Sequence, residues 1–243
     1  IYPHAPVNKQ EEAAVSTAEL VKKHDRDLIV IGNGTASRET ESFVAELIKG
    51  GMDVEYTIVS EAGASVYSAS KLARKEFPDL DVSIRGAISI GRRIQDPLAE
   101  LVKIDPKSLG VGMYQHDISQ KRLEKALNEV VVDAVNHVGV EINTASAALL
   151  TYAAGISSNN AAKIIEHRSQ NGKFKTRKEL LDVYGFGPKT YEQAAGFIRL
   201  DSKQDPFALT PIHPESYQAA EKILENIDYA AADIRDKAKL KEI

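Results

Sequence analysis

The stretch that decides the fold is residues 139–200, and its centre is YGFGPK, residues 184–189. Apolar runs compatible with a helix flank this centre, residues 178–183 before it and 190–200 after it. Two glycines around one apolar residue suit a tight hairpin that needs positive φ and close backbone approach. Pro188 suits the first turn of a helix, where its missing N–H costs nothing. The pattern therefore predicts a helix, a glycine hairpin and a second helix.

The start of the second helix is a predicted anion site. Free backbone N–H groups and the positive end of the helix dipole attract negative charge there. We expect Gly185 and Gly187 to let a phosphate approach, and Lys189 and Thr190 to hold it. The alternative is an ordinary turn with a glycine at the helix end. Two glycines, a proline and a lysine in this order, within a basic segment, favour the phosphate of a nucleic acid.

A second copy of the pattern lies thirty positions upstream, where Gly155 corresponds to Gly185. Two helix-hairpin-helix copies can bury a shared four-helix core that one copy alone could not. Ser157 stands in the first copy where the second glycine would be, and no lysine follows it directly. The pattern leaves open whether Gly155 and Ser157 touch phosphate or pack against the second copy.

The repeat is basic within an acidic chain. Residues 155–200 carry eight basic and four acidic residues, with Lys173 and Lys175 among the expected nucleic-acid contacts, whereas the whole chain of 243 residues has a formal net charge of -4. That net charge argues against a nucleic-acid coat over the whole surface and leaves local basic patches open.

Composition excludes other classes. Cysteine is absent, so no disulfide framework or Cys-based metal site is expected, which fits a cytoplasmic location. The chain contains no run of about 18 apolar residues, so no transmembrane helix is expected. The six histidines show no spacing typical of metal ligands. We expect no cofactor, no metal, no membrane contact and no small-molecule substrate.

The first half predicts an α/β domain over residues 1–104. Apolar strands at 28–31 and 54–60 alternate with helices at 11–24, 37–50 and 63–77, and more helix follows at 81–103, with a fresh start at Pro97. Two strands are too few for a stable open sheet. This half is therefore predicted to lack its first strands.

The second half is predicted to be all helical. A loop rich in proline and glycine at 105–118 is the expected linker, and no strand signal follows it. Helices are expected at 119–138, 160–168 and 215–227, with a charged helix or tail at 230–243. We expect a tandem helix-hairpin-helix domain at 119–200, then a loop and helices at 201–243. The whole chain should be mostly helical.

Glu61 and Asp96 are candidate carboxylates for Mg²⁺. Metal-dependent cleavage of a phosphodiester usually needs three or more acids, so a solvated or helix-capping role is the favoured interpretation. The loop 32–35 lacks the lysine of a phosphate-gripping P-loop and is interpreted as an ordinary turn after a strand. The pair Arg92-Arg93 is expected on a solvated or salt-bridged face.

Five segments together resemble one protein family. They are IGNGTASRETE (31–41), VSEAGASVYSAS (59–70), RRIQDPLAELVKI (92–104), YQHDISQKRL (114–123) and AAGISSNNAAKIIEHRSQNGKFKTRKELLDVYGFGPKTYEQAAGFIRL (153–200). The chain resembles the Tex family of bacterial transcription accessory proteins over at least residues 1–217. The resemblance implies the later part of a YqgF domain, which has an RNase H-like fold, followed by tandem helix-hairpin-helix units. It also implies first strands before residue 1 and an OB-fold RNA-binding domain after residue 243.

The resemblance bears on catalysis too. Active relatives of the YqgF fold carry an aspartate on the first strand, which this chain does not include. The next acid would fall where Asn33 stands, while Glu61 and Asp96 match the later acidic positions. With one acid absent and one replaced, we expect no nuclease activity.

The leading hypothesis is a nucleic-acid-binding fragment of a transcription accessory factor that grips phosphates without sequence preference. The alternatives are a metal-dependent, resolvase-like nuclease and a protein-docking scaffold. DNA or RNA backbone is the expected partner, and the resemblance adds the transcription machinery. The sequence leaves open DNA against RNA, the physiological partner and the oligomeric state.

Overall fold

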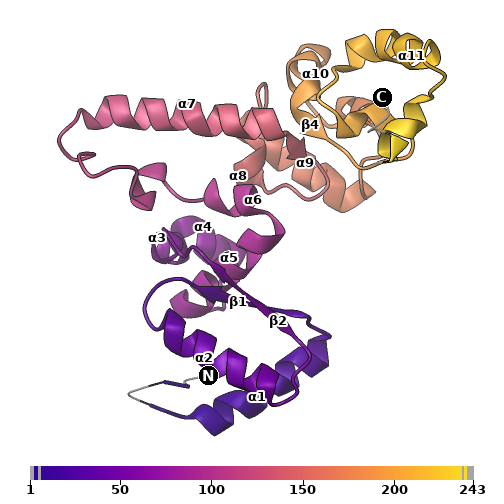
Figure 1. The fold of residues 1–243 in the computed structure, drawn as a ribbon. Helices are drawn as coiled ribbons and strands as arrows, with labels where there is room; N and C mark the ends of the chain where they lie inside the picture. Colours follow the sequence, from indigo (N-terminus) through magenta and orange to yellow (C-terminus); the bar gives the residue numbers. More distant parts are fainter. Residues whose placement is uncertain (1–2, 5–6, 237, 240–243) are drawn as a thin grey trace. The chain divides into compact units, whose positions relative to one another are not determined.

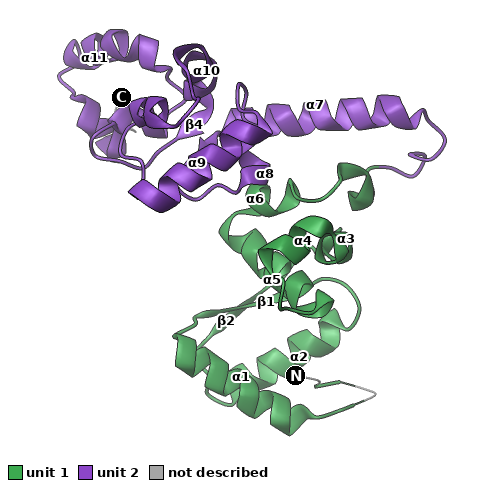
Figure 2. Ribbon diagram, turned by 180° about the vertical axis from the view of Figure 1, so that it is seen from behind, with its two compact units in different colours: residues 1–111 green, residues 112–243 purple. Residues whose placement is uncertain are grey.

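A computed structural model describes residues 3–4, 7–236 and 238–239. The chain divides into two compact units, Ile1–Val111 and Gly112–Ile243 (Figures 1 and 2). The division falls inside the segment 105–118 that the sequence indicates as a linker. Helices dominate and strands are few and short, which confirms the predicted fold class.

Unit 1 begins with two helices and a pair of parallel strands. Its elements are α1 (Gln10–His24), β1 (Leu28–Gly32), α2 (Ser37–Lys49) and β2 (Glu55–Val59). The strands pair in register from Leu28 with Glu55 to Gly32 with Val59, so α2 makes the crossover that parallel strands need. Both predicted strands are confirmed.

The core beneath these strands is small. Ile31 of β1 packs with Phe43 and Val44 of α2 and with Ala13 of α1, and all four are buried. Figure 1 shows α1 and α2 beside the strand pair. Ile58 and Tyr56 of β2 remain exposed, at 47% and 37%. Both pair with residues of β1 that face this core, Tyr56 with Ile29 and Ile58 with Ile31, so the helices cover the β1 side of that face and leave the β2 side partly open.

The remainder of unit 1 is helical. It comprises α3 (Ala64–Ala69), α4 (Lys71–Glu76), α5 (Val82–Gln95), α6 (Pro97–Leu101) and a 3₁₀ turn, η1 (Pro106–Leu109). The predicted single helix at 63–77 is wrong, because Ser70 is extended and its hydroxyl caps α4 by accepting from the Ala73 N–H at 3.1 Å. Pro97 begins a new helix as predicted.

Unit 2 contains the repeat and the segment that follows it. The α-helices in its described residues are α7 (Gln120–Val138), α8 (Ala147–Leu150), α9 (Ser158–Asn171), α10 (Pro188–Ala194) and α11 (Tyr217–Glu225). Its 3₁₀ turns are η2 (Arg177–Asp182), η3 (Ala195–Phe197), η4 (Pro206–Leu209), η5 (Pro214–Ser216) and η6 (Ala231–Arg235). The helix before the second hairpin is therefore 3₁₀, not α. The end of the predicted tail, 240–243, lies outside the described residues.

Two short strands correct the expectation that none follows the linker. β3 (Val140–Glu141) pairs in parallel with β4 (Ile198–Arg199). The predicted helix 190–200 is wrong from residue 195 onward, because Ile198 leaves the helix to pair with Val140, and both side chains are fully buried. Two residues are too few to produce a recognisable alternation in the sequence. The strand pair joins the chain just before the repeat to the chain just after it.

Arg177 is 1% exposed, and its side chain is at the centre of a hydrogen-bond network in unit 2. Its guanidinium donates five hydrogen bonds of 2.6–3.1 Å, to the carbonyl oxygens of Ile198, Ala208, Thr210 and Ile212 and to the Tyr217 hydroxyl. Its backbone N–H donates to the Asp205 carboxylate at 3.0 Å. One side chain thus holds the irregular chain between β4 and α11 against the second repeat.

Replacing Arg177 with Met should lower the free energy of unfolding by about 3 kcal/mol or more, because several buried acceptors lose their donors at once. Urea denaturation followed by circular dichroism measures the change. Arg122→Met is the matched control, since Arg122 is exposed on α7 and its loss should change stability by about 0.5 kcal/mol or less. Equal midpoints for the two variants would contradict this role of Arg177.

Candidate nucleic-acid interface

The two hairpins have the same backbone construction. Gly155 and Gly185 are left-handed, with φ of 79° and 77°. The Ile156 N–H donates to the Ala153 carbonyl at 3.1 Å, and thirty residues later the Phe186 N–H donates to Val183 at 2.9 Å. Positive φ at Gly185 is confirmed, and the repeat found in the sequence is a repeat in space.

The copies pack on each other reciprocally. A Cβ added at Gly155 would lie 2.9 Å from the Gln193 Cβ, and one added at Gly185 would lie 2.8 Å from the Lys163 Nζ. Lys163 and Gln193 are themselves thirty positions apart. Each copy's second helix therefore covers the hairpin glycine of the other copy.

The hairpins differ at the residue before the second helix. Ser157 and Gly187 are both extended, with φ of -77° and -80°. The expectation that Gly187 supplies positive φ is therefore wrong. The Ser157 hydroxyl accepts from the Asn160 N–H at 3.2 Å and so caps α9. No side-chain cap occupies the start of α10, and a Cβ at Gly187 would meet nothing within 4 Å.

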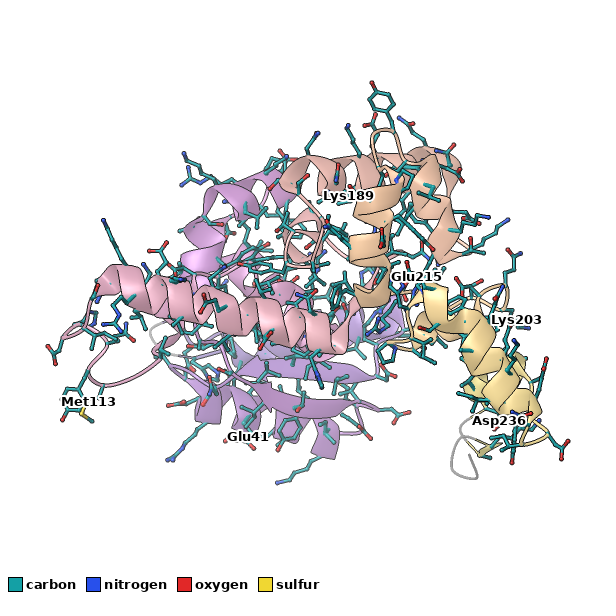
Figure 3. All side chains as sticks on the ribbon, turned by 90° about the horizontal axis from the view of Figure 1, so that it is seen from above. Glu41, Met113, Lys189, Lys203, Glu215 and Asp236 are labelled. Carbon is teal, nitrogen blue, oxygen red and sulfur yellow. The ribbon has the colours of Figure 1, made fainter. Side chains whose placement is uncertain are left out.

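The open start of α10 lies beside two lysines. Lys189 is exposed at the second position of α10 (Figure 3), and Thr190 follows it, partly buried. The ammonium of Lys163 lies 4.7 Å from the centre of the Tyr184 ring, at the tip of the same hairpin. Sequence reasoning did not select Lys163 or Tyr184. Lys163 lies there because the second helix of each copy packs on the hairpin of the other copy. The sequence signal that could have found it is its spacing of thirty residues from Gln193, which occupies the equivalent position in the second copy.

The first hairpin faces its partner copy. Gly155 lies against the backbone and Cβ of Gln193, and Ser157 is used as a cap. This arrangement favours the packing role that the sequence left open for these two residues. It leaves the second hairpin as the one with an unused helix start.

Lys173 and Lys175 lie in the loop between α9 and η2, where both are exposed. They flank Phe174, which is 4% exposed and stacks on His167 with 5.2 Å between ring centres. The backbone N–H of Lys175 donates to the Glu179 carboxylate at 2.8 Å. Their ammonium groups are available to solvent, but Lys163 is the lysine packed on the second hairpin.

Some of the basic residues of segment 155–200 are used in hydrogen bonds within unit 2 and not at its surface. Arg168 donates to the carbonyl oxygens of Ile142 and Ala145 at 2.7 and 3.1 Å, and burial lowers the pKa of its guanidinium. Arg199 donates to the Gly196 carbonyl at 2.7 Å, and burial likewise lowers its pKa. With Arg177, three of the eight basic residues hold the unit together from within.

The two candidate carboxylates of unit 1 have local roles. Asp96 caps α6, because its Oδ1 accepts from the Ala99 N–H at 2.9 Å. Glu61 follows β2, its N–H donates to the Asn33 Oδ1 at 3.0 Å, and its carboxylate lies against the turn at Gly34. Among the described residues, no group of three or more His, Cys, Asp or Glu side chains is arranged to hold a metal ion.

The pair Arg92-Arg93 was expected on a solvated or salt-bridged face; Arg92 fits this expectation, whereas Arg93 is buried. It is 6% exposed and donates to the Ser60 carbonyl at 2.6 Å. Burial lowers the pKa of its guanidinium, and the negative charges of Glu100 and Glu61 act in the opposite direction. A buried cation therefore contributes to the electrostatic environment of Glu61, where a nuclease would place metal-binding acids. Arg92 lies over the Phe77 ring at 5.0 Å, and its guanidinium is 3.9 Å from the Glu100 carboxylate.

No helix within residues 3–4, 7–236 and 238–239 is long and apolar enough to cross a membrane.

Comparison with protein families matches three parts of the chain. Residues 1–95 match the Tex protein YqgF-like domain, residues 135–199 a helix-hairpin-helix motif and residues 205–243 an HHH domain. The third match was not expected from the sequence, where 201–243 was interpreted as a loop and helices. A YqgF-like domain followed by helix-hairpin-helix domains defines the class of this protein.

Curated relatives agree with that class. Protein YhgF of Escherichia coli is 53% identical over 236 residues, covering 96% of this chain and 30% of the relative. Transcriptional accessory protein Tex of Neisseria gonorrhoeae is 50% identical over 240 residues, covering 98% and 32%. S1 RNA-binding domain-containing protein 1 of Homo sapiens is 51% identical over 205 residues, covering 83% and 20%. The chain belongs to the Tex family and spans about a third of the length of the bacterial relatives it matches.

Alanine at the three hairpin glycines should rank them by backbone role. Gly155→Ala should destabilise most, since positive φ costs about 1–2 kcal/mol and the Gln193 Cβ leaves no room. Gly185→Ala should lose about 1–2 kcal/mol, because the end of the Lys163 side chain can move aside. Gly187→Ala should change stability by about 0.5 kcal/mol or less. Urea denaturation checks the order, and a Gly187→Ala loss as large as that of Gly185→Ala would contradict it.

Proposed function

We propose that this chain binds nucleic acid through the phosphate backbone, with the second hairpin as its main contact. The helix-hairpin-helix match over 135–199 supports a nucleic-acid-binding role. The name of the Neisseria relative, a transcriptional accessory protein, is in keeping with it. The geometry of the hairpin supports a contact at residues 185–190.

The observation that carries the proposal is the uncapped start of α10, with Lys189 in its first turn and Lys163 packed on the same hairpin. Gly187 leaves open space for a phosphate oxygen to approach the backbone. The N–H groups of Lys189 and Thr190 then donate to that oxygen, as at other anion-binding helix starts. The ammonium groups of Lys189 and Lys163 add positive charge to this hairpin. Lys173 and Lys175 extend the basic surface from the neighbouring loop.

Such contacts determine the selectivity. Hydrogen bonds to phosphate fix position and carry no base information, so binding should tolerate any sequence. Neutralising phosphates releases counterions, so affinity should fall steeply with salt. The first hairpin contributes less, because Ser157 already occupies the corresponding site at the start of α9.

We assign no nuclease function to unit 1. Asn33 stands at an acidic position of the family pattern, and Asp96 is engaged as a helix cap. Glu61 is left as the single candidate whose carboxylate has no capping role, beside the turn at Gly34. One carboxylate does not assemble the two-metal site on which phosphodiester cleavage usually depends.

Lys189→Gln should weaken binding to DNA or RNA of any sequence and reduce the slope of log K against log salt by about 1. Fluorescence anisotropy with labelled oligonucleotides at several salt concentrations measures both. Lys121→Gln, on exposed α7, is the charge-matched control and should leave the slope unchanged. Gly187→Val should fold normally but bind poorly, because its side chain fills the approach to the helix start. Salt-independent affinity, or equal loss in both lysine variants, would refute the proposal.

Incubation with branched or single-stranded DNA and RNA in Mg²⁺ or Mn²⁺ should yield no cleavage products, because the described carboxylates do not converge. Denaturing gel electrophoresis of end-labelled strands detects any product. Cleavage that disappears in Asp96→Asn and persists in the exposed control Asp79→Asn would establish the nuclease alternative instead.

A further inference from the structure

Tyr184 is a large aromatic side chain at the tip of the second hairpin, and it is 85% exposed. A tyrosine in this position gives up the stabilisation that burial of its ring would provide. Phosphate binding at Lys189 and Thr190 does not use the ring. The ring therefore needs an explanation of its own.

The base of this side chain is held rigidly. Val183 and Phe186, on either side of the tip, are 2% and 3% exposed, and their backbones are joined by the 2.9 Å hydrogen bond that closes the turn. The Lys163 ammonium lies 4.7 Å from the ring centre, within the range of a cation–π contact. The ring is thus presented on a fixed turn with a cation against it and most of its surface in solvent.

The first hairpin is an internal comparison. Its residue corresponding to Tyr184 is Ala154, and the residues corresponding to Lys189 and Lys163 are Asn159 and Gln193. The backbone is the same in both hairpins, so the turn itself does not require an aromatic residue or a cation. The ring and both cations are concentrated at the hairpin whose helix start is uncapped.

We propose that Tyr184 stacks on an unpaired nucleobase adjacent to the phosphate held at the start of α10, so that the second hairpin prefers single-stranded DNA or RNA to a duplex. This inference rests on the proposed function, because the stacked base belongs to the same strand as the bound phosphate. Within a duplex, neighbouring base pairs cover the faces of each base, whereas a single strand offers them to aromatic side chains. Stacking is tolerant of sequence because every base has a π-face.

The Lys163 ammonium suits this arrangement in two ways. It limits the motion of the ring through the cation–π contact, which reduces the ordering needed when a base arrives. It also places positive charge where the sugar-phosphate chain passes from the stacked base to the bound phosphate. A protein-docking role for Tyr184 would give no reason for the second cation, Lys189, at the helix start beside it.

The experiment compares three ligands for the 243-residue chain: a mixed-sequence single-stranded DNA, the RNA of the same sequence and the DNA duplex. Anisotropy titrations should show tighter binding to both single strands than to the duplex. Tyr184→Ala should weaken single-strand binding about tenfold, a typical loss for one stacked base, and change duplex binding about twofold or less. Tyr184→Phe should retain single-strand affinity. Tyr114→Ala is the matched control, since Tyr114 is 70% exposed and lies outside the repeat.

A direct readout accompanies the titrations. Single strands that carry 5-iodouracil should crosslink to residue 184 on irradiation, as located by mass spectrometry, and the crosslink should be lost in Tyr184→Ala. Equal wild-type affinity for single strand and duplex, or equal loss in Tyr184→Ala and Tyr114→Ala, would overturn the stacking inference while leaving phosphate binding intact. Absence of salt-dependent binding to all three ligands would overturn the proposed function, and the inference with it.

Discussion

One buried guanidinium holds together the chain that follows the repeat in unit 2. Arg177 gathers four carbonyl oxygens and a tyrosine hydroxyl from the chain that follows the repeat, and that chain has little regular structure of its own. A planar group with five donors in fixed directions can satisfy such scattered acceptors, which an ammonium or an apolar side chain cannot. Arg177 is also the first residue of η2, the element that leads into the second hairpin. The same residue therefore fixes the approach to the hairpin and the segment 198–217.

The two copies of the repeat differ at the position of Arg177. The position corresponding to Arg177 in the first copy is Ala147, which is exposed at the start of α8. The first copy carries a serine cap and packs its hairpin glycine on Gln193, so its polar groups are satisfied within the unit. The second copy keeps the same turn but replaces the cap with Gly187. The start of α10 therefore lacks the side-chain hydrogen bond that Ser157 provides at α9, and an uncapped helix start of this kind is what the proposed phosphate contact uses.

The features that the sequence predicted correctly are those determined by a few neighbouring residues. The left-handed conformation of Gly185, the helix start at Pro97 and the apolar strands β1 and β2 each depend on a few adjacent residues. The features that the sequence did not reveal depend on distant partners. Ile198 leaves its helix because it pairs with Val140 in a short strand pair. Lys163 contacts Tyr184 because the second helix of the first copy packs on the hairpin of the second copy. Gly187 differs from the expectation for another reason: its φ of -80° is open to any residue, and the sequence alone does not separate a glycine that needs positive φ from one that does not.

The number of basic residues in a segment does not show how many of their charges are available at its surface. Eight basic residues make the segment 155–200 locally basic, but the arginines at 168, 177 and 199 donate to carbonyl groups within the unit. What remains near the second hairpin is a small group, with Lys163 and Lys189 at its centre. At physiological ionic strength, charges beyond about 8 Å are largely screened, so the net charge of -4 of the chain would weigh little against two ammonium groups at the proposed phosphate contact. Electrostatic attraction from so few cations is modest, and for that reason an aromatic contact beside them is a physically effective addition: it adds affinity that salt does not screen.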